Sequence, residues 1–196
     1  MTRKWPLIPT LVVAAAILTM IGLGIWQLQR KAEKQALLTR YEAARALPPI
    51  AFPTVPIGDD LPLFRRATGH CIEVESVRSQ AGQNRSGETG HVHIANCSTG
   101  AEGPGMAVEL GWSKDPNAGR GWDGGEVSGV IAPDKLMRMR LVSSTGLAGL
   151  DASAPPSPAS IPNNHLLYAI QWFLFAGIAG LIYFLALRKR WKGFGQ

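Results

Sequence analysis

The chain has 196 residues, of which 46% are hydrophobic and 17% charged, with a mean hydropathy of +0.05 and a formal net charge of +6. All 14 Asp and Glu lie between Glu33 and Asp151, where Lys and Arg nearly balance them, so the positive excess belongs to the two ends. A basic nucleic-acid-binding module has its excess in the folded core or on one helix, so that class is excluded and no nucleic-acid partner is expected. The distribution indicates charge at a membrane surface instead. The basic residues at the ends are Arg3, Lys4, Arg30, Arg188, Lys189, Arg190 and Lys192.

Residues 6–26 contain no charge and predict the first transmembrane helix. A helix of this length rises about 31 Å, which matches a hydrocarbon core of roughly 30 Å. A cleaved signal peptide is the alternative, because Arg3 and Lys4 precede the apolar run. The run is longer than a usual leader, however, and GIWQLQRKAEK after it offers no small-residue cleavage site. Trp26 falls where an interfacial aromatic anchor is expected.

The next two segments differ in composition. Residues 27–47 are strong helix formers without Gly or Pro, so we expect a helical extension that Pro48 and Pro49 end. Residues 48–63 contain five prolines and predict an extended linker without regular structure.

Residues 64–142 change to an alternating pattern that predicts short strands separated by Gly-rich turns such as RSGETG. The expected fold class is therefore membrane α+β: two antiparallel transmembrane helices flanking a small antiparallel β domain, either a sheet or a partly closed barrel. The predicted strands cover residues 66–77, 91–97, 106–113, 126–132 and 135–142.

The C-terminal part returns the chain to the membrane. Residues 143–164 form a predicted Ser, Ala and Pro linker, and the uncharged residues 165–187 predict the second transmembrane helix. The basic tail, residues 188–196, places the C-terminus in the cytoplasm by the positive-inside rule. With two spans, residues 1–5 are then cytoplasmic as well, and the β domain is periplasmic. We expect a multi-pass protein of the bacterial inner membrane.

The two cysteines and three of the four histidines lie in the predicted β domain. Two Cys in an oxidising periplasm favour a disulfide between Cys71 and Cys97, which would add about 3 kcal/mol to a small core. A weaker alternative is a transition-metal site, because His91, His93 and Cys97 share one face of a strand and His70 is near in sequence. No spacing here matches an established metal motif, which favours the disulfide.

No enzyme constellation emerges, and we expect a protein without catalytic activity. Ser86, Glu88 and His91 are close in sequence, but RSGETGH is a turn without a nucleophile elbow or an oxyanion helix. No acid, base and nucleophile can be named together.

Three stretches of the chain have distinctive sequences: GIWQLQRKAEKQALL at the end of the first span, ELGW with GGEVSGVI in the middle, and PNNHLLYAIQWFLFA at the start of the second span. Together they resemble the Surfeit locus protein 1 family. The last is the most specific, because a Pro-Asn-Asn-His cap before Tyr and Gln-Trp-Phe is not a generic way to begin a membrane helix. One departure is that Glu109, Leu110, Gly111 and Trp112 stand where such proteins often have Asn-Arg-Gly-Trp.

The resemblance implies a factor for cytochrome c oxidase biogenesis that assists delivery or insertion of haem a into the haem-bearing subunit. Its implied partners are the oxidase catalytic subunit, other assembly factors and membrane lipid, with a homo-oligomer possible. Its implied haem ligand corresponds to His165. From the residues themselves, Asn163 or Asn164 can cap the helix, so that His165 lies in its first turn. The helix dipole disfavours an imidazolium there, and iron requires a neutral imidazole.

Residues near His165 suggest where a porphyrin would lie. On the second helix, His165, Ala169, Trp172 and Ala176 recur at helical spacing and share one face. On the first helix, Gly22, Gly24 and Trp26 lie at the matching depth, and glycines there would leave room for the ring, with Trp172 or Trp26 beside it. The alternative is that the small residues allow close helix packing. The function is then that of a haem-free scaffold that stabilises an oxidase assembly intermediate.

Overall fold

The computed structural model describes residues 6–55, 58, 60–100 and 105–193, without the side chains of residues 192 and 193. The predicted cytoplasmic segment 1–5, with Arg3 and Lys4, and the side chain of Lys192 lie outside this description. The chain divides into two compact units, of which one contains the chain up to Leu37 and from Pro162 onward, and the other Leu38–Ile161.

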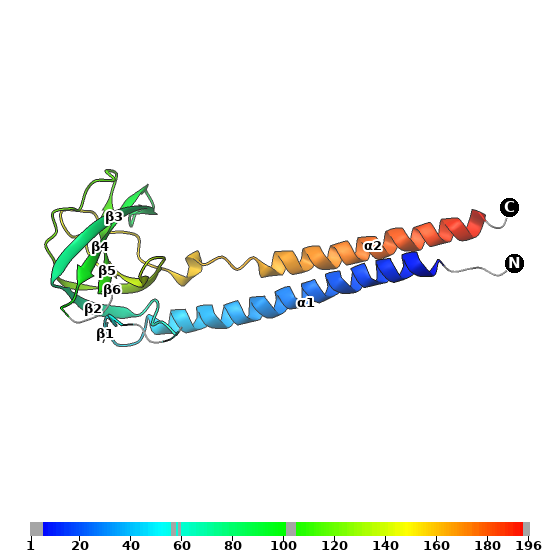
Figure 1. Ribbon diagram of the computed structural model, residues 1–196, viewed down its shortest axis with the longest axis horizontal. Coiled ribbons are helices and arrows are strands. Elements are labelled where there is room, and N and C mark those ends of the chain that lie inside the picture. The colour runs from blue at the N-terminus through cyan, green and yellow to red at the C-terminus, as the bar shows by residue number, and fades with distance from the viewer. Residues whose placement is uncertain (1–5, 56–57, 59, 101–104, 194–196) are drawn as a thin grey trace. The chain divides into compact units, whose positions relative to one another are not determined.

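The first unit is a pair of helices that run antiparallel, drawn blue and orange in Figure 1. Helix α1 (Leu7–Ala44) continues without a break through the predicted helical extension, and α2 (His165–Gly193) begins at the predicted residue. Near one end of the pair Thr10 Oγ1 and Tyr183 OH lie 2.5 Å apart. Both helices have an apolar window long enough to cross a membrane, with mean hydropathies of 2.3 and 2.0.

The second unit is a seven-stranded mixed sheet in the order β1-β2-β6-β7-β5-β4-β3. The predicted α+β class is confirmed, with two long apolar helices flanking a β domain. The sheet is not closed, and it differs from the expected antiparallel form because β1–β2 and β5–β7 are parallel pairs. The strands are β1 (Ile50–Ala51), β2 (Arg66–Cys71), β3 (Glu73–Gln83), β4 (Thr89–Ser98), β5 (Met106–Ser113), β6 (Gly125–Asp134) and β7 (Arg138–Ser143).

The segment predicted as one strand over residues 66–77 is two strands, β2 and β3, joined at Ile72. Before Ile72 the chain pairs with β6, and after it the chain pairs with β4. The Ile72 N–H donates to the Ser98 carbonyl at 3.0 Å, which fixes the change of partner. Since β2 and β3 lie far apart in the strand order yet adjoin in the chain, the sheet must curl strongly.

The curled sheet has apolar clusters on both faces. Along β4, Ala95 and Cys97 enter the larger cluster, whereas Val92 and Ile94 enter the smaller one with Trp112. Strand β5 has one extra residue in its pairing with β4, between the positions opposite His93 and Ile94. That bulge changes the alternation, so that Ala107 and Trp112 lie on the same face although their positions differ by an odd number, which would place them on opposite faces of a regular strand.

A disulfide joins Cys71 at the end of β2 to Cys97 on β4, with Cα atoms 5.3 Å apart. The disulfide connects two strands that are not neighbours in the sheet, so it holds β2 close to β4 and stabilises the curled form of the sheet. Both cysteines are almost completely buried in the larger cluster.

The two predicted linkers are more ordered than expected. Within residues 48–63, β1 pairs with β2, and Phe52 is buried against the core. Within residues 143–164, the Trp112 N–H donates to the Asp151 carbonyl at 2.7 Å, and a short 3-10 helix (Pro158–Ser160) follows. Prolines prevent long strands here, but backbone groups between them still pair with free strand edges.

Candidate functional site

His165 is the first residue of α2, in the turn where the sequence predicted it. The Leu167 N–H donates to the Asn164 carbonyl at 3.1 Å, so Asn164 occupies the position before the helix. The side chain of Asn163 does not cap the helix, because its Oδ1 is buried and has no hydrogen-bond partner among the described residues. His165 therefore lies in the first turn of α2, at the end of the helix where backbone N–H groups have no partner within the helix.

The His165 ring is held by Gln27, a residue of α1 that sequence reasoning missed. His165 Nδ1 lies 2.8 Å from Gln27 Oε1. An amide oxygen can only accept, so Nδ1 is the donor and the neutral ring has its lone pair on Nε2. Nε2 has no hydrogen-bond partner within the described part of the chain, so it is free to bind a metal. The available sequence signal was the position of Gln27, which directly follows the apolar stretch.

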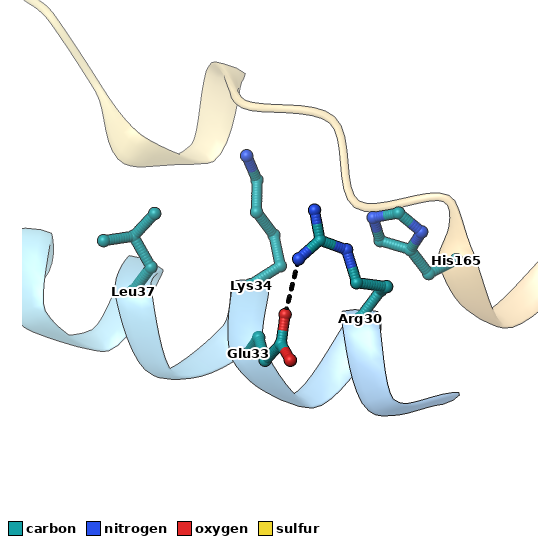
Figure 2. A pocket seen from close by; sticks show the side chains of 5 residues that line it. All are labelled: Arg30, Glu33, Lys34, Leu37 and His165. Atoms are coloured by element: carbon teal, nitrogen blue, oxygen red, sulfur yellow. Dashed lines mark hydrogen bonds and ion pairs between the residues drawn. The ribbon is translucent and has the colours of Figure 1, made fainter. Parts of the chain in front are cut away.

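A cavity of about 280 Å³ opens beside His165. It is lined by His165 and by successive turns of α1, and in Figure 2 Arg30 and Lys34 extend from α1 on the side where His165 lies. Arg30 Nη1 forms an ion pair with Glu33 Oε2 at 2.7 Å, and both side chains are more than half exposed. The lining residues are Arg30, Glu33, Lys34, Leu37 and His165.

The stripe predicted on α2 forms the contact with α1, since Ala169 and Ala176 are buried at 1% and 6% exposure. The room expected at Gly24 is not there. A Cβ on Gly24 would lie 2.6 Å from the Phe173 ring, so the missing side chain of Gly24 makes space for Phe173 rather than for a porphyrin. This matches the close helix packing that was the alternative explanation of the small residues.

The other predicted ring neighbours do not line the described cavity beside His165. Gly22 has no atom within 4 Å of its Cβ position, and Trp26 is 49% exposed. Trp172 packs edge-on against Phe175, with ring centroids 6.2 Å apart. Of the predicted cofactor residues, only His165 lines this cavity in the described part of the chain, and its neighbours there come from the turns of α1 that follow Trp26.

His93 is held inside the β domain by two serine side chains. His93 is completely buried, with Nε2 2.8 Å from Ser113 Oγ and Nδ1 3.2 Å from Ser79 Oγ. Burial lowers the pKa of His93, the nearby His91 lowers it further, and Asp115 opposes the shift. Both ring nitrogens of His93 are hydrogen-bonded and Cys97 is in the disulfide, so neither residue offers a free ligand atom to a metal. The described residues contain no group of three or more His, Cys, Asp or Glu that could hold one.

The turn with Ser86 and Glu88 is held by Asn84, whose Oδ1 accepts from both backbone N–H groups at 3.0 and 2.9 Å. Glu88 pairs with Lys114 at 2.6 Å, and the hydrogen bond from Lys114 and its charge lower the pKa of Glu88. These contacts explain the turn without any link to His91.

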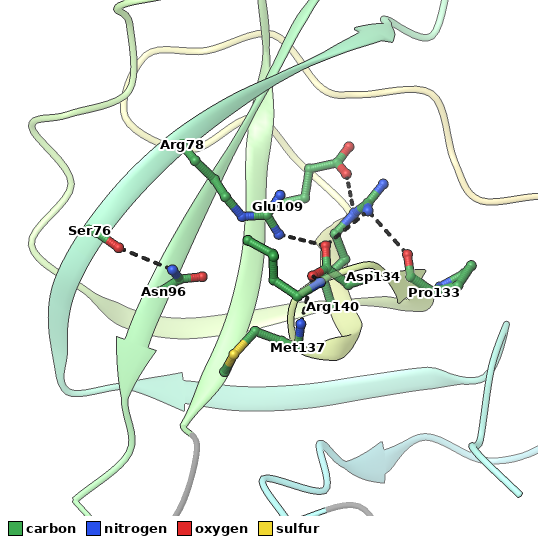
Figure 3. A network of polar contacts seen from close by, with 9 residues as sticks. Ser76, Arg78, Asn96, Glu109, Pro133, Asp134, Met137 and Arg140 are labelled. Atoms are coloured by element: carbon green, nitrogen blue, oxygen red, sulfur yellow. Dashed lines mark hydrogen bonds and ion pairs between the residues drawn. The ribbon is translucent and has the colours of Figure 1, made fainter. Parts of the chain in front are cut away.

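A network of charged side chains lies on the face of the sheet that carries the smaller apolar cluster (Figure 3). Asp134 Oδ1 accepts from Arg78 at 2.6 Å and from Arg140 at 3.3 Å, and Arg140 Nε donates to Glu109 Oε2 at 2.7 Å. The Asp134 and Glu109 side chains are 1% and 4% exposed. Glu109, one of the two residues that depart from the family pattern, thus has a half-buried cationic partner on β7.

Asp134 is the most strongly perturbed group of this network. Burial alone would raise its pKa, but the Met137 N–H, the Arg78 side chain and the Leu136 N–H outweigh burial and lower the pKa to about 2. The carboxylate is therefore charged at any pH near neutrality. The four side chains balance two positive and two negative charges, which indicates a structural role in joining β3, β5, β6 and β7.

Comparison with known proteins gives one finding. The model of the SURF1 family matches residues 14–177, which include most of α1, the whole sheet and the first half of α2. A comparison with the curated proteins found no match.

Proposed function

The chain belongs to the SURF1 family, and from this membership we propose that it binds haem a through His165 and presents it to the haem-bearing oxidase subunit. Members of that family are assembly factors of cytochrome oxidase, so this chain serves oxidase biogenesis. Its two long apolar helices are consistent with a membrane protein.

The single observation that supports haem binding best is the His165–Gln27 hydrogen bond of 2.8 Å. A haem ligand must be a neutral imidazole with one free nitrogen, and its other nitrogen is commonly fixed by a hydrogen bond. His165 offers such a nitrogen, because the acceptor on α1 fixes Nδ1 and leaves Nε2 for the iron. When bound, haem a supplies a redox-active iron, whereas the chain's own residues hold and orient it.

The position of this site along the two helices also suits an amphipathic ligand. His165 begins the apolar stretch of α2, and Gln27 and Arg30 directly follow the apolar stretch of α1. Side chains at such positions lie near a membrane interface, where an apolar ring and its charged substituents both find favourable surroundings.

We further propose that the protein lies in the bacterial inner membrane with both termini in the cytoplasm and the β domain in the periplasm. Arg188, Lys189 and Arg190 follow the apolar part of α2 and support this orientation. A cysteine introduced at the exposed Glu75 of β3 should react with a membrane-impermeant maleimide in intact spheroplasts. Protection of that cysteine until the cells are lysed would contradict the orientation.

A haem-free scaffold remains the second candidate, and the Gly24–Phe173 contact favours it. The two helices pack without a gap at this depth, so the pair can act as a binding surface for an oxidase subunit without any cofactor.

Absorbance of the full chain distinguishes the two functions. Protein purified from cells that make haem a should show a Soret band that His165→Ala abolishes and Gln27→Leu weakens, with expression unchanged. His70→Ala removes an exposed histidine of the β domain and should retain the band. A colourless wild type, or a band that persists in His165→Ala, would favour the scaffold.

A further inference from the structure

We propose that the cavity beside His165 is a carboxylate-binding subsite, in which Arg30 and Lys34 receive the two propionate groups of the porphyrin. This inference rests on the proposed function and names the part of the ligand that α1 recognises.

The cavity contains more positive than negative charge. Its ionisable lining residues besides His165 are two cations and one anion, and the anion Glu33 is paired with Arg30. Lys34 has no salt-bridge or hydrogen-bond partner among the residues that the structure describes, although it is half-buried. A ligand that offers carboxylates beside the imidazole would therefore find one unpaired ammonium and one guanidinium.

The spacing of the two cations suits a dicarboxylate. Arg30 and Lys34 are four residues apart on α1, which places them on one face with Cβ atoms roughly 5–6 Å apart. Figure 2 shows both side chains on the side of α1 where His165 lies. Porphyrin propionates leave one edge of the ring from neighbouring pyrroles, so two adjacent cations can bind both while the imidazole faces the iron. Guanidinium also binds carboxylate through two parallel hydrogen bonds.

Glu33 is expected to act against binding. The side chains of Arg30 and Glu33 are 54% and 63% exposed, and ion pairs between such exposed side chains contribute little to stability. Arg30 can therefore exchange Glu33 for a ligand carboxylate at small cost, while the negative charge of Glu33 stays at the rim and repels the ligand. Removing that charge should strengthen binding, which a purely structural role of the ion pair does not predict.

The test compares ferric protoporphyrin IX with its dimethyl ester, titrated into the full chain in phosphatidylcholine nanodiscs. The ester keeps the iron and the ring but lacks the two charges. We expect the wild type to bind the free acid about 10-fold more tightly than the ester. Lys34→Gln and Arg30→Gln should each lower the affinity for the free acid about 3- to 5-fold and leave the affinity for the ester unchanged.

Two further variants make the comparison specific. Lys31→Gln removes the same charge from the same helix but from a residue that does not line the cavity, so it should retain the wild-type preference. Glu33→Gln should raise the affinity for the free acid about 3-fold and leave the affinity for the ester unchanged.

Failure of this inference differs from failure of the proposed function. If the wild type binds acid and ester equally, or if Lys31→Gln acts like Lys34→Gln, the subsite is overturned even when a histidine-ligand spectrum is present. If phosphatidylglycerol nanodiscs abolish the preference, the cations serve a lipid phosphate, and the subsite is also overturned. Loss of the histidine-ligand spectrum in His165→Ala supports the proposed function, whatever the ratio of the affinities for the free acid and the ester. Persistence of that spectrum in His165→Ala contradicts the proposed function.

Discussion

The helix pair and the β domain are stabilised in different ways. Only 6% and 11% of the apolar windows of α1 and α2 are buried within the chain, whereas both faces of the sheet have buried clusters, a disulfide and a charge network. The cavity beside His165 nevertheless lies in the helix pair. A ligand site on helices that bury little of their apolar surface within the chain can accept and release its ligand with little rearrangement, and the described lining of the cavity includes no residue of the sheet.

The largest expected effect is confined to the β domain. Asp134→Asn removes the negative charge that Arg78 and Arg140 share, and its amide group cannot accept from the Leu136 and Met137 N–H as well, so the unfolding free energy should fall by about 3 kcal/mol. Urea unfolding of the full chain in micelles, with hydrogen exchange of β4 and β5 peptides, measures it. Glu75→Gln on the exposed side of β3 is the control and should change little. A Soret band lost together with the network would mean that the two regions are not independent.

A smaller effect comes from His93. Its pKa is lowered by burial, so the neutral ring is the folded form, and the unfolded chain takes up a proton first as the pH falls below about 6.5. Stability is therefore fully present above that pH and decreases toward lower pH by at most about 1.4 kcal/mol per pH unit.

Comparing wild type with His93→Gln at pH 7.5 and 5.5 isolates this contribution. The variant should lose the pH dependence that the wild type shows, and His70→Gln should keep it because that histidine is exposed. If the free energy of unfolding falls equally from pH 7.5 to 5.5 in the wild type and in His93→Gln, the pH dependence belongs to other groups.

The smallest effect tests the helix pair. Gly24→Ala puts a methyl group where the Phe173 ring lies, so the ring must move, and the pair should lose about 1 kcal/mol. Gly22→Ala has open space around it and should be neutral. Titration with SDS in mixed micelles, followed by near-ultraviolet circular dichroism, compares the two. Equal behaviour of both variants would show that Gly24 is not a packing position.

Several elements could be predicted because their signals are local. Strand β5 begins and ends at the predicted residues, and α2 begins at His165, since apolar alternation and a Pro-Asn-Asn segment mark them in the chain. The break between β2 and β3 has no such mark. It arises because Ile72 pairs with Ser98, and a residue's pairing partner cannot be deduced from its own neighbours in sequence. The same holds for β1 and for the strand-like segment around Asp151.

The candidate site divides in the same way. The sequence by itself determined two apolar spans, a β domain between them and a histidine at the start of the second span, because length, charge and cap residues act locally. Only the tertiary structure decided that Gln27 holds His165, that Phe173 fills the space at Gly24, and that Arg30 and Lys34 share a cavity with the imidazole. These facts depend on the register of one helix against the other. Small shifts along the helix axes change that register without altering the pattern of either sequence.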